Sequence, residues 1–151
     1  MNRAEATLRQ NINKYYTELH TVLIKYNLDD KTERNLNIDV TGVSKEHSPV
    51  KIFCSKNTKP QAVTSNRSTL TTIIAAENAL GNHVPPYCDF KGKRWSPDVL
   101  NNAVPGAGGK MSETGWCNSQ LFQTYMNNFF FIHIWTPDPE QPTRVLYNGH
   151  I

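Results

Sequence analysis

The sequence lacks the features of several protein classes. No apolar run is long enough to cross a bilayer, and the first ten residues contain no apolar core of a signal peptide, so we expect neither membrane association nor a secretory leader. The three cysteines are isolated, without a Cys-x-x-Cys pair or a Cys/His spacing typical of zinc. Such usage predicts buried thiols in a reducing, intracellular compartment. No two of the five histidines are four residues apart, which removes a common metal-binding signal.

Hydrophobic residues are also scarce, at 38% of 151 residues, although aromatic residues at 10% partly compensate. This length allows one domain with a core. A net charge of +3 is compatible with nucleic-acid binding but does not require it. The run Gly106 to Lys110 lacks the spacing of a phosphate-binding loop, so we reject that interpretation.

The most informative stretch is Asn35 to Val43. Leu36, Ile38 and Val40 alternate with polar residues, which predicts a half-buried strand that ends near Gly42. Asp39 lies on the polar face of this strand, close to its exit. A rigid strand is a common support for a metal-binding carboxylate, but a solvated surface Asp gives the same pattern.

The remaining elements follow from periodicity and turn residues. Apolar residues between Ile12 and Tyr26 predict a packing helix. We expect strands at 50–55 and 68–76. The second of these is the first arm of a hairpin whose turn is at 80–82. The second arm, at 84–90, should be irregular or at an edge of the sheet because it contains two prolines. The loops that we expect are at 56–60 and, as one long connection, at 91–111, and a linker is expected at 137–142. A buried strand is expected at 144–147. A second helix should begin with Ser112 as its cap and end before Pro137. The apolar stripe of that helix is assigned to the core (Leu121, Phe122, Tyr125, Met126, Phe129, Phe130).

Several of these segments occur together, in one order, in a known family. Asn-Ile-Asp-Val-Thr-Gly at 37–42 resembles the N-x-D-E-T-G segment of the DDE endonuclease domain of pogo/Tigger-type transposases, the group that includes CENP-B-like and jerky-like proteins. The similar segments that follow are Thr71–Gly81, Val84–Pro86, Phe90–Lys93, Ser112–Trp116 and Val145–His150. The resemblance covers nearly all residues after about position 10.

This resemblance implies an α/β fold of RNase H-like type, a mixed sheet with flanking helices that is truncated at its C-terminal end. We expect a helical lead-in at 1–34 and a partial DDE endonuclease domain at 35–151. In the family, acidic residues on two neighbouring strands and on a later helix hold two Mg²⁺ or Mn²⁺ ions for phosphodiester cleavage.

Carried over to this chain, the resemblance places Asp39 at the first acidic position and Asn148 at the second, 109 residues later. The third acid has no counterpart before Ile151, and Val40 replaces the Glu of the family segment. Asn148 is neutral, so it cannot offset the charge of a metal ion. Asp39 is therefore the only expected metal ligand, and we expect no tightly bound metal cofactor and no cleavage.

The expected partner is DNA, bound without sequence specificity, in the nucleus as the resemblance implies. Only Lys91, Lys93 and Arg94 cluster among the basic residues that could contact phosphates (Lys51, Lys56, Lys59, Arg67, Lys91, Lys93, Arg94), and a scattered solvated surface is an equal alternative. No helix-turn-helix segment for sequence-specific binding is visible.

Two other functions stay open. In the first alternative, the chain is part of an active metal-dependent nuclease or transposase that missing sequence or another chain completes. In the second, it is a domesticated interaction module without a nucleic-acid role. A truncated sheet also exposes apolar area around Val145 and Leu146, which predicts self-association or a partner over that face.

Overall fold

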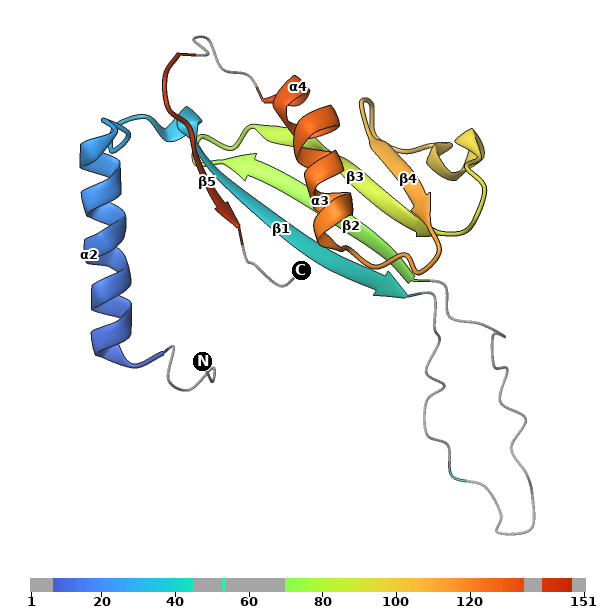
Figure 1. Cartoon of the computed structure of the whole chain (residues 1–151), viewed down its shortest axis with the longest axis horizontal. Helices are drawn as coiled ribbons and strands as arrows, with labels where there is room; N and C mark the ends of the chain where they lie inside the picture. The colour runs from blue at the N-terminus through green and yellow to red at the C-terminus, as the bar shows by residue number, and fades with distance from the viewer. Residues whose placement is uncertain (1–6, 45–52, 54–69, 135–139, 148–151) are drawn as a thin grey trace. The chain divides into compact units, whose positions relative to one another are not determined.

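The computed structural model describes residues 7–44, 53, 70–134 and 140–147. It shows an α/β protein with a mixed five-stranded sheet in the order β4-β3-β2-β1-β5, which confirms the predicted class (Figure 1). In chain order the strands are β1 (Asn35–Ser44), β2 (Leu70–Asn78), β3 (His83–Lys91), β4 (Gly108–Ser112) and β5 (Arg144–Tyr147). The helical elements are α2 (Arg9–Lys25), η1 (Thr32–Arg34), η2 (Pro97–Leu100), α3 (Ser119–Tyr125), the π-helical η3 (Met126–Phe130) and α4 (Phe131–His133). No helix in the described ranges is both long and apolar enough to span a membrane.

The chain forms two compact units. Unit 1 contains the described residues within Met1–Asp39, Ala76–Val84 and Ile134–Gly149. Unit 2 contains those within Val40–Ala75 and Pro85–His133. Strands β1, β2 and β3 each contribute residues to both units.

Unit 1 has a small apolar core, and helix α2 contributes no buried residue to it. The buried apolar residues include two of the three that alternation predicted on β1, together with residues from neighbouring segments (Leu28, Leu36, Ile38, Ala76, Val84). The third, Val40, belongs to unit 2 and is half-buried. Helix α2 follows the predicted helical period, but none of its residues is buried, so the packing role predicted for it is wrong. Its aromatic residues Tyr15 and Tyr16 contact each other instead, with ring centroids 5.3 Å apart.

The connection from α2 to the sheet is fixed by side-chain bonds to the backbone. The Asn35 side chain donates to the carbonyl oxygens of Leu28 and Lys31, at 2.9 and 2.8 Å. Arg34, which is buried, donates from Nη1 to the Gln141 carbonyl oxygen at 3.0 Å. These bonds satisfy buried polar groups that would otherwise destabilise the fold.

Strand β5 pairs with β1 in parallel, from Asn35 opposite Arg144 to Ile38 opposite Tyr147. The strand predicted at 144–147 is therefore present, but its four residues are only half-buried rather than buried. The reason is its position at the edge of the sheet, where only one neighbouring strand covers it.

The predicted hairpin is confirmed. Strand β2 runs into a turn at 79–82, and β3 returns beside it (Figure 1). The Asn78 amide donates to the Asn82 carbonyl oxygen at 2.9 Å, and Gly81 has a φ of +93°, a conformation that favours glycine.

The second arm of the hairpin differs from its prediction. Strand β3 is regular and interior, between β2 and β4, despite Pro85 and Pro86. Its pairing with β4 begins at Tyr87 opposite Gly108, after both prolines. The prolines therefore precede the β3–β4 ladder, so that ladder needs no amide hydrogen from either of them.

Unit 2 is held by an aromatic core between α3–η3 and the strands β3 and β4. The Tyr87 ring on β3 lies 5.6 Å from that of Tyr125 and 5.0 Å from that of Phe129. Leu121, Tyr125, Phe129 and Phe130 are buried, which confirms the predicted core role of those four, whereas Phe122 and Met126 are half-buried. A Cβ on Gly108 would lie 2.3 Å from the Phe129 ring, so this strand position admits only glycine.

Two predictions about the middle of the chain are wrong. The stretch 91–111 is not one long connection, because it contains η2 and most of β4, whose glycines hid the strand signal. Ser112 does not cap a helix and instead ends β4. The cap is Asn118, whose Oδ1 accepts from the Leu121 amide at 2.8 Å. The helix ends at His133, before Pro137 as predicted.

Several expectations lie outside the described residues. They are the strand at 50–55 apart from Phe53, the loop at 56–60, Cys54, the linker residues 137–139, and Asn148. Of the other two cysteines, Cys88 and Cys117 are free thiols and half-buried rather than buried.

Candidate functional site

Asp39 lies on β1, on the face opposite to the core residues. Ile38 has no exposed surface, whereas Asp39 is exposed, as the alternation predicted. It follows Ile38, the last residue of β1 that is in register with β5, and Ile38 pairs with Tyr147. Asn148 follows Tyr147 in sequence but lies outside the described residues, so its distance from Asp39 stays a prediction.

The described chain offers no cluster of potential metal ligands around Asp39. Across the described ranges, no group of at least three His, Cys, Asp or Glu side chains could hold a metal ion. Asp39 is thus one carboxylate on an exposed strand face, where a single divalent ion would keep most of its water ligands.

Unit 1 contains a small hollow at the start of β1, formed by residues of β1, β2 and β5. Its volume is about 150 Å³, and its lining combines apolar surface with several polar side chains (Asn35, Asn37, Glu77, Asn78, Arg144). Asn35 Oδ1 and Arg144 Nε are buried and have no hydrogen-bond partner within the described part of the chain. Because a water occupies about 30 Å³, this volume suits a few ordered waters that would satisfy both atoms.

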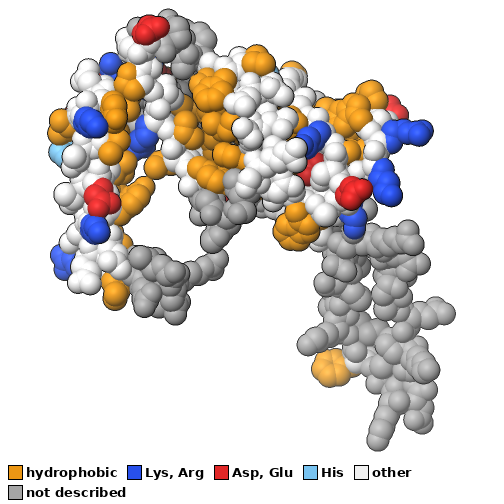
Figure 2. Space-filling model, in the orientation of Figure 1, with side chains coloured by type: hydrophobic (Ala, Val, Ile, Leu, Met, Phe, Trp, Pro, Cys, Tyr) orange, Lys and Arg blue, Asp and Glu red, His pale blue; other side chains and the backbone are white. Residues whose placement is uncertain are grey.

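A positively charged segment follows strand β3 in unit 2. Lys91 ends β3, and Lys93 and Arg94 follow in the connection to η2; all three are exposed. None of them forms an ion pair with a described carboxylate. Lys and Arg side chains gather over this connection (Figure 2). Their charges are therefore available to a polyanion.

The turn after β4 is tied to the sheet by a chain of hydrogen bonds. Ser112 Oγ donates to Asp89 Oδ2 at 2.6 Å and accepts from the Gly115 amide at 2.9 Å. Thr72 Oγ1 on β2 donates to the Gly115 carbonyl oxygen at 2.7 Å. Ser112 and Gly115 belong to the segment Ser112–Trp116 that carried part of the family resemblance, and here they anchor a turn.

Asp89 is the buried charged group of this network. Its side chain is 0% exposed, and its Oδ1 has no hydrogen-bond partner among the described residues. Burial raises the pKa of the Asp89 carboxyl, against the opposing effects of the Ser112 hydrogen bond and of Lys110, which lies directly opposite on β4. Burial, and next the Asp89 charge, raise the pKa of the Cys117 thiol, so that thiol is a poor nucleophile.

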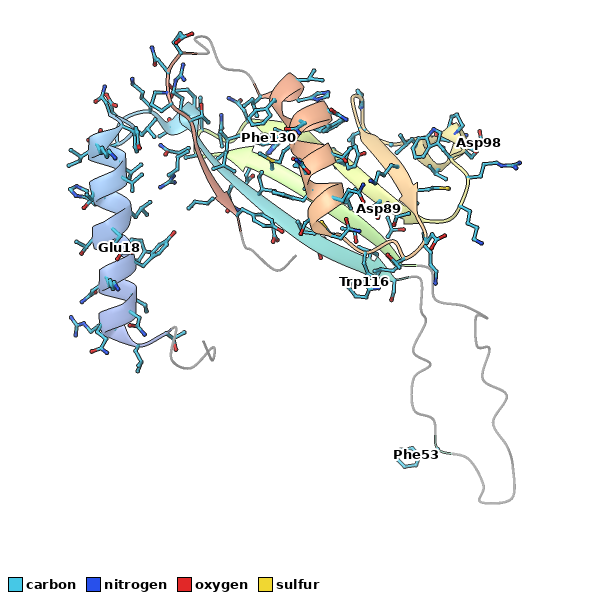
Figure 3. All side chains as sticks on the ribbon, viewed as in Figure 1. Glu18, Phe53, Asp89, Asp98, Trp116 and Phe130 are labelled. Carbon is cyan, nitrogen blue, oxygen red and sulfur yellow. The ribbon has the colours of Figure 1, made fainter. Side chains whose placement is uncertain are left out.

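Sequence reasoning missed Asp89 and Trp116. Asp89 lies two residues after Tyr87 on β3, so it shares the inward face of that aromatic residue, and alternation could have predicted its burial. The prolines hid this signal, because they caused β3 to be predicted as irregular. Trp116 is 63% exposed at the outer edge of the turn after β4 (Figure 3), and nothing in its local sequence predicts that exposure.

Comparisons with known proteins add no identification. No protein-family model matches the chain, and neither a curated protein nor a solved structure matches it.

Proposed function

We propose that this chain is a degenerate part of a DDE-type endonuclease domain, nuclear, that retains affinity for nucleic-acid backbones without cleaving them. The observation that carries the proposal is the exposed group Lys91, Lys93 and Arg94 at the end of β3, which forms no ion pair with a described carboxylate. The order of motifs in the sequence supports the family. So does the parallel pairing of β5 with β1, since a DDE fold of RNase H-like type requires neighbouring strands for its first two acidic positions.

Backbone binding of this kind depends on charge and not on base identity. Lys91, Lys93 and Arg94 would each neutralise about one phosphate and release its counterions. The logarithm of the affinity for duplex DNA then falls with the logarithm of salt concentration, with a slope of about −3 for three contacts. DNA sequence should have no effect, because phosphate contacts position a protein but do not read bases.

The test is a DNA titration followed by fluorescence anisotropy, at salt concentrations between about 50 and 200 mM. The variant Lys91→Gln/Lys93→Gln/Arg94→Gln should lose most of the affinity and most of the salt dependence. A control with the same change in charge is Arg9→Gln/Lys14→Gln/Lys25→Gln on α2, where the three residues are also exposed.

Equal losses in the two triple variants would mean that net charge alone drives binding, which contradicts an interface at Lys91–Arg94. No binding by the wild-type chain would favour the interaction module without a nucleic-acid role. Strong preference for one DNA sequence would also contradict the proposal.

Metal titration separates this proposal from an active nuclease completed by another chain. The wild-type chain should bind Mn²⁺ negligibly by calorimetry, and Asp39→Ala should not change the result. Micromolar binding that disappears in Asp39→Ala would overturn the loss of metal chemistry. If Asn148 lies beside Asp39, Asn148→Asp should strengthen Mn²⁺ binding. In the metal-free variant the two carboxylates repel each other, and a bound ion that both of them coordinate relieves that repulsion.

A further inference from the structure

The charged segment of unit 2 lies beside an exposed tryptophan that the backbone network holds in place. A Cβ on Gly115 would lie 3.1 Å from both the amide nitrogen and the Cβ of Lys91, so the turn that carries Trp116 packs directly against the end of β3. The Gly92 amide also donates to the Ser112 carbonyl oxygen at 2.8 Å. The turn that carries Trp116 therefore lies against Lys91, and Lys93 and Arg94 follow Lys91 in the chain.

A second exposed tryptophan follows these cations in the chain. Trp95 follows Arg94 directly and is 41% exposed, while Trp116 is 63% exposed. We call Lys91, Lys93, Arg94, Trp95 and Trp116 the Trp–cation surface. Two described acidic residues lie close to it in sequence. Glu113 is exposed in the turn, and Asp98 in η2 accepts hydrogen bonds from Ser96 Oγ and Asn101 Nδ2.

The turn before Trp116 is fixed by a network that includes a buried carboxylate. Gly115 has a φ of +70°, and its carbonyl oxygen and amide are both bonded, to Thr72 and to Ser112. The Ser112 hydroxyl is anchored in turn on Asp89, a carboxylate without any exposed surface. Burying a carboxylate destabilises a fold unless its contacts compensate, and here those contacts fix the turn before Trp116.

We propose that the Trp–cation surface binds single-stranded nucleic acid, with an unpaired base stacked on Trp116 and the adjacent phosphates on Lys91, Lys93 and Arg94. This inference rests on the proposed nucleic-acid function and names its substrate class. Exposed aromatic rings beside cations are the arrangement by which proteins bind single strands without sequence preference. In a duplex the base faces are stacked on each other, so Trp116 has nothing to stack on, and only the phosphates remain as partners.

Three ligands separate stacking from charge: an oligothymidylate, a blunt DNA duplex and heparin, a polyanion without bases. The change Trp116→Ala should weaken oligothymidylate binding about 10-fold, as expected for the loss of one base–aromatic stack. Binding of duplex and heparin should stay within about 2-fold, because their charge contacts are unchanged. The change Trp116→Phe should recover much of the affinity, since a phenyl ring also stacks on a base.

The matched control is Tyr16→Ala on α2, since Tyr16 is 61% exposed and belongs to unit 1. It should leave all three affinities unchanged. A second measurement avoids dependence on a truncated side chain. In a Trp95→Phe/Trp135→Phe background, Trp116 is the only tryptophan, and oligothymidylate should quench its fluorescence whereas heparin should not.

The outcomes distinguish this inference from the proposed function. If the Lys91, Lys93 and Arg94 variant loses binding but Trp116→Ala does not, stacking is wrong and backbone binding stands. If Trp116→Ala weakens heparin as much as oligothymidylate, the surface has no base contact, and the inference is again wrong. If the wild-type chain binds none of the three ligands, both proposals fail.

Discussion

Gly115 offers the sharpest test of how the turn after β4 is held. Its φ is +70°, and an added Cβ would lie 2.5 Å from the Leu70 carbonyl oxygen, closer than real Cβ contacts come. Gly81 has a φ of +93°, but a Cβ there would meet nothing within 4 Å. The pair therefore separates the cost of a positive φ from the cost of a close approach.

The magnitudes follow from these two environments. Gly81→Ala should cost about 1–2 kcal/mol in the free energy of unfolding, which is the strain of a left-handed conformation. Gly115→Ala carries the same strain and a steric overlap, which typically adds about 1–3 kcal/mol. Relief of the overlap moves the turn away from β2, which stretches the 2.7 Å bond from Thr72 Oγ1 to the Gly115 carbonyl oxygen. We expect Gly115→Ala to be worse by about 2 kcal/mol, or about 30-fold in the unfolding equilibrium.

Urea unfolding of the wild type and both variants measures this difference. Oligothymidylate binding of the folded Gly115→Ala protein should also fall, while Gly81→Ala should bind normally. Equal destabilisation by the two substitutions would refute the reasoning, because it would mean that the turn moves freely away from β2 and is not anchored by the network.

Three further predictions concern single side chains. Because burial raises the pKa of Asp89 in the folded state, its contribution to stability is complete below the unfolded-state value of 3.8 and is lost as pH rises through the folded-state pKa. Asp89→Asn should remove this pH-dependent loss of stability. The urea midpoint of the variant should therefore change less from acidic to alkaline pH than that of the wild type, and an equal change of the midpoint in both proteins would contradict this. The Tyr125 hydroxyl is buried without a hydrogen-bond partner in the described structure, so Tyr125→Phe should leave stability unchanged or raise it by about 1–3 kcal/mol, and a clear loss in thermal unfolding would show an unseen partner. Asn118→Ala removes the acceptor for the Leu121 amide and should cost about 1 kcal/mol in urea unfolding, with Asn118→Ser restoring most of it; no loss would mean that the cap is not needed.

The local pattern of apolar and polar residues was sufficient to predict an element where one of its faces is buried and the other is exposed. Strand β1 was predicted closely, because a period of two requires Leu36 and Ile38 to share a face that Asp39 does not. The hairpin turn was predicted for a similar reason, since Gly81 supplies a conformation that other residues avoid. The apolar stripe of the second helix correctly gave the core residues Tyr125 and Phe130.

Local pattern failed where long-range pairing decides the outcome. Strand β4 has glycines at positions where a Cβ would overlap the Phe129 ring or the Cys88 carbonyl oxygen, so packing selected residues with poor strand propensity. Pro85 and Pro86 precede the ladder of β3 with β4, which begins only at Tyr87, and this register is not a property of either segment alone.

The sequence by itself determined the inward and outward faces of β1 and the charge of the segment Lys91–Arg94, since each depends on neighbouring residues only, whereas the α/β class came from the family resemblance. The tertiary structure alone decided that β5 pairs with β1, that Asp89 is buried, and that the turn of Trp116 packs against Lys91. The physical reason is that burial and proximity arise from contacts between segments far apart in the chain. Ser112, for example, is of a residue type that is favoured at helix N-caps. Only its 2.6 Å hydrogen bond to Asp89, 23 residues earlier, shows that it anchors a turn instead.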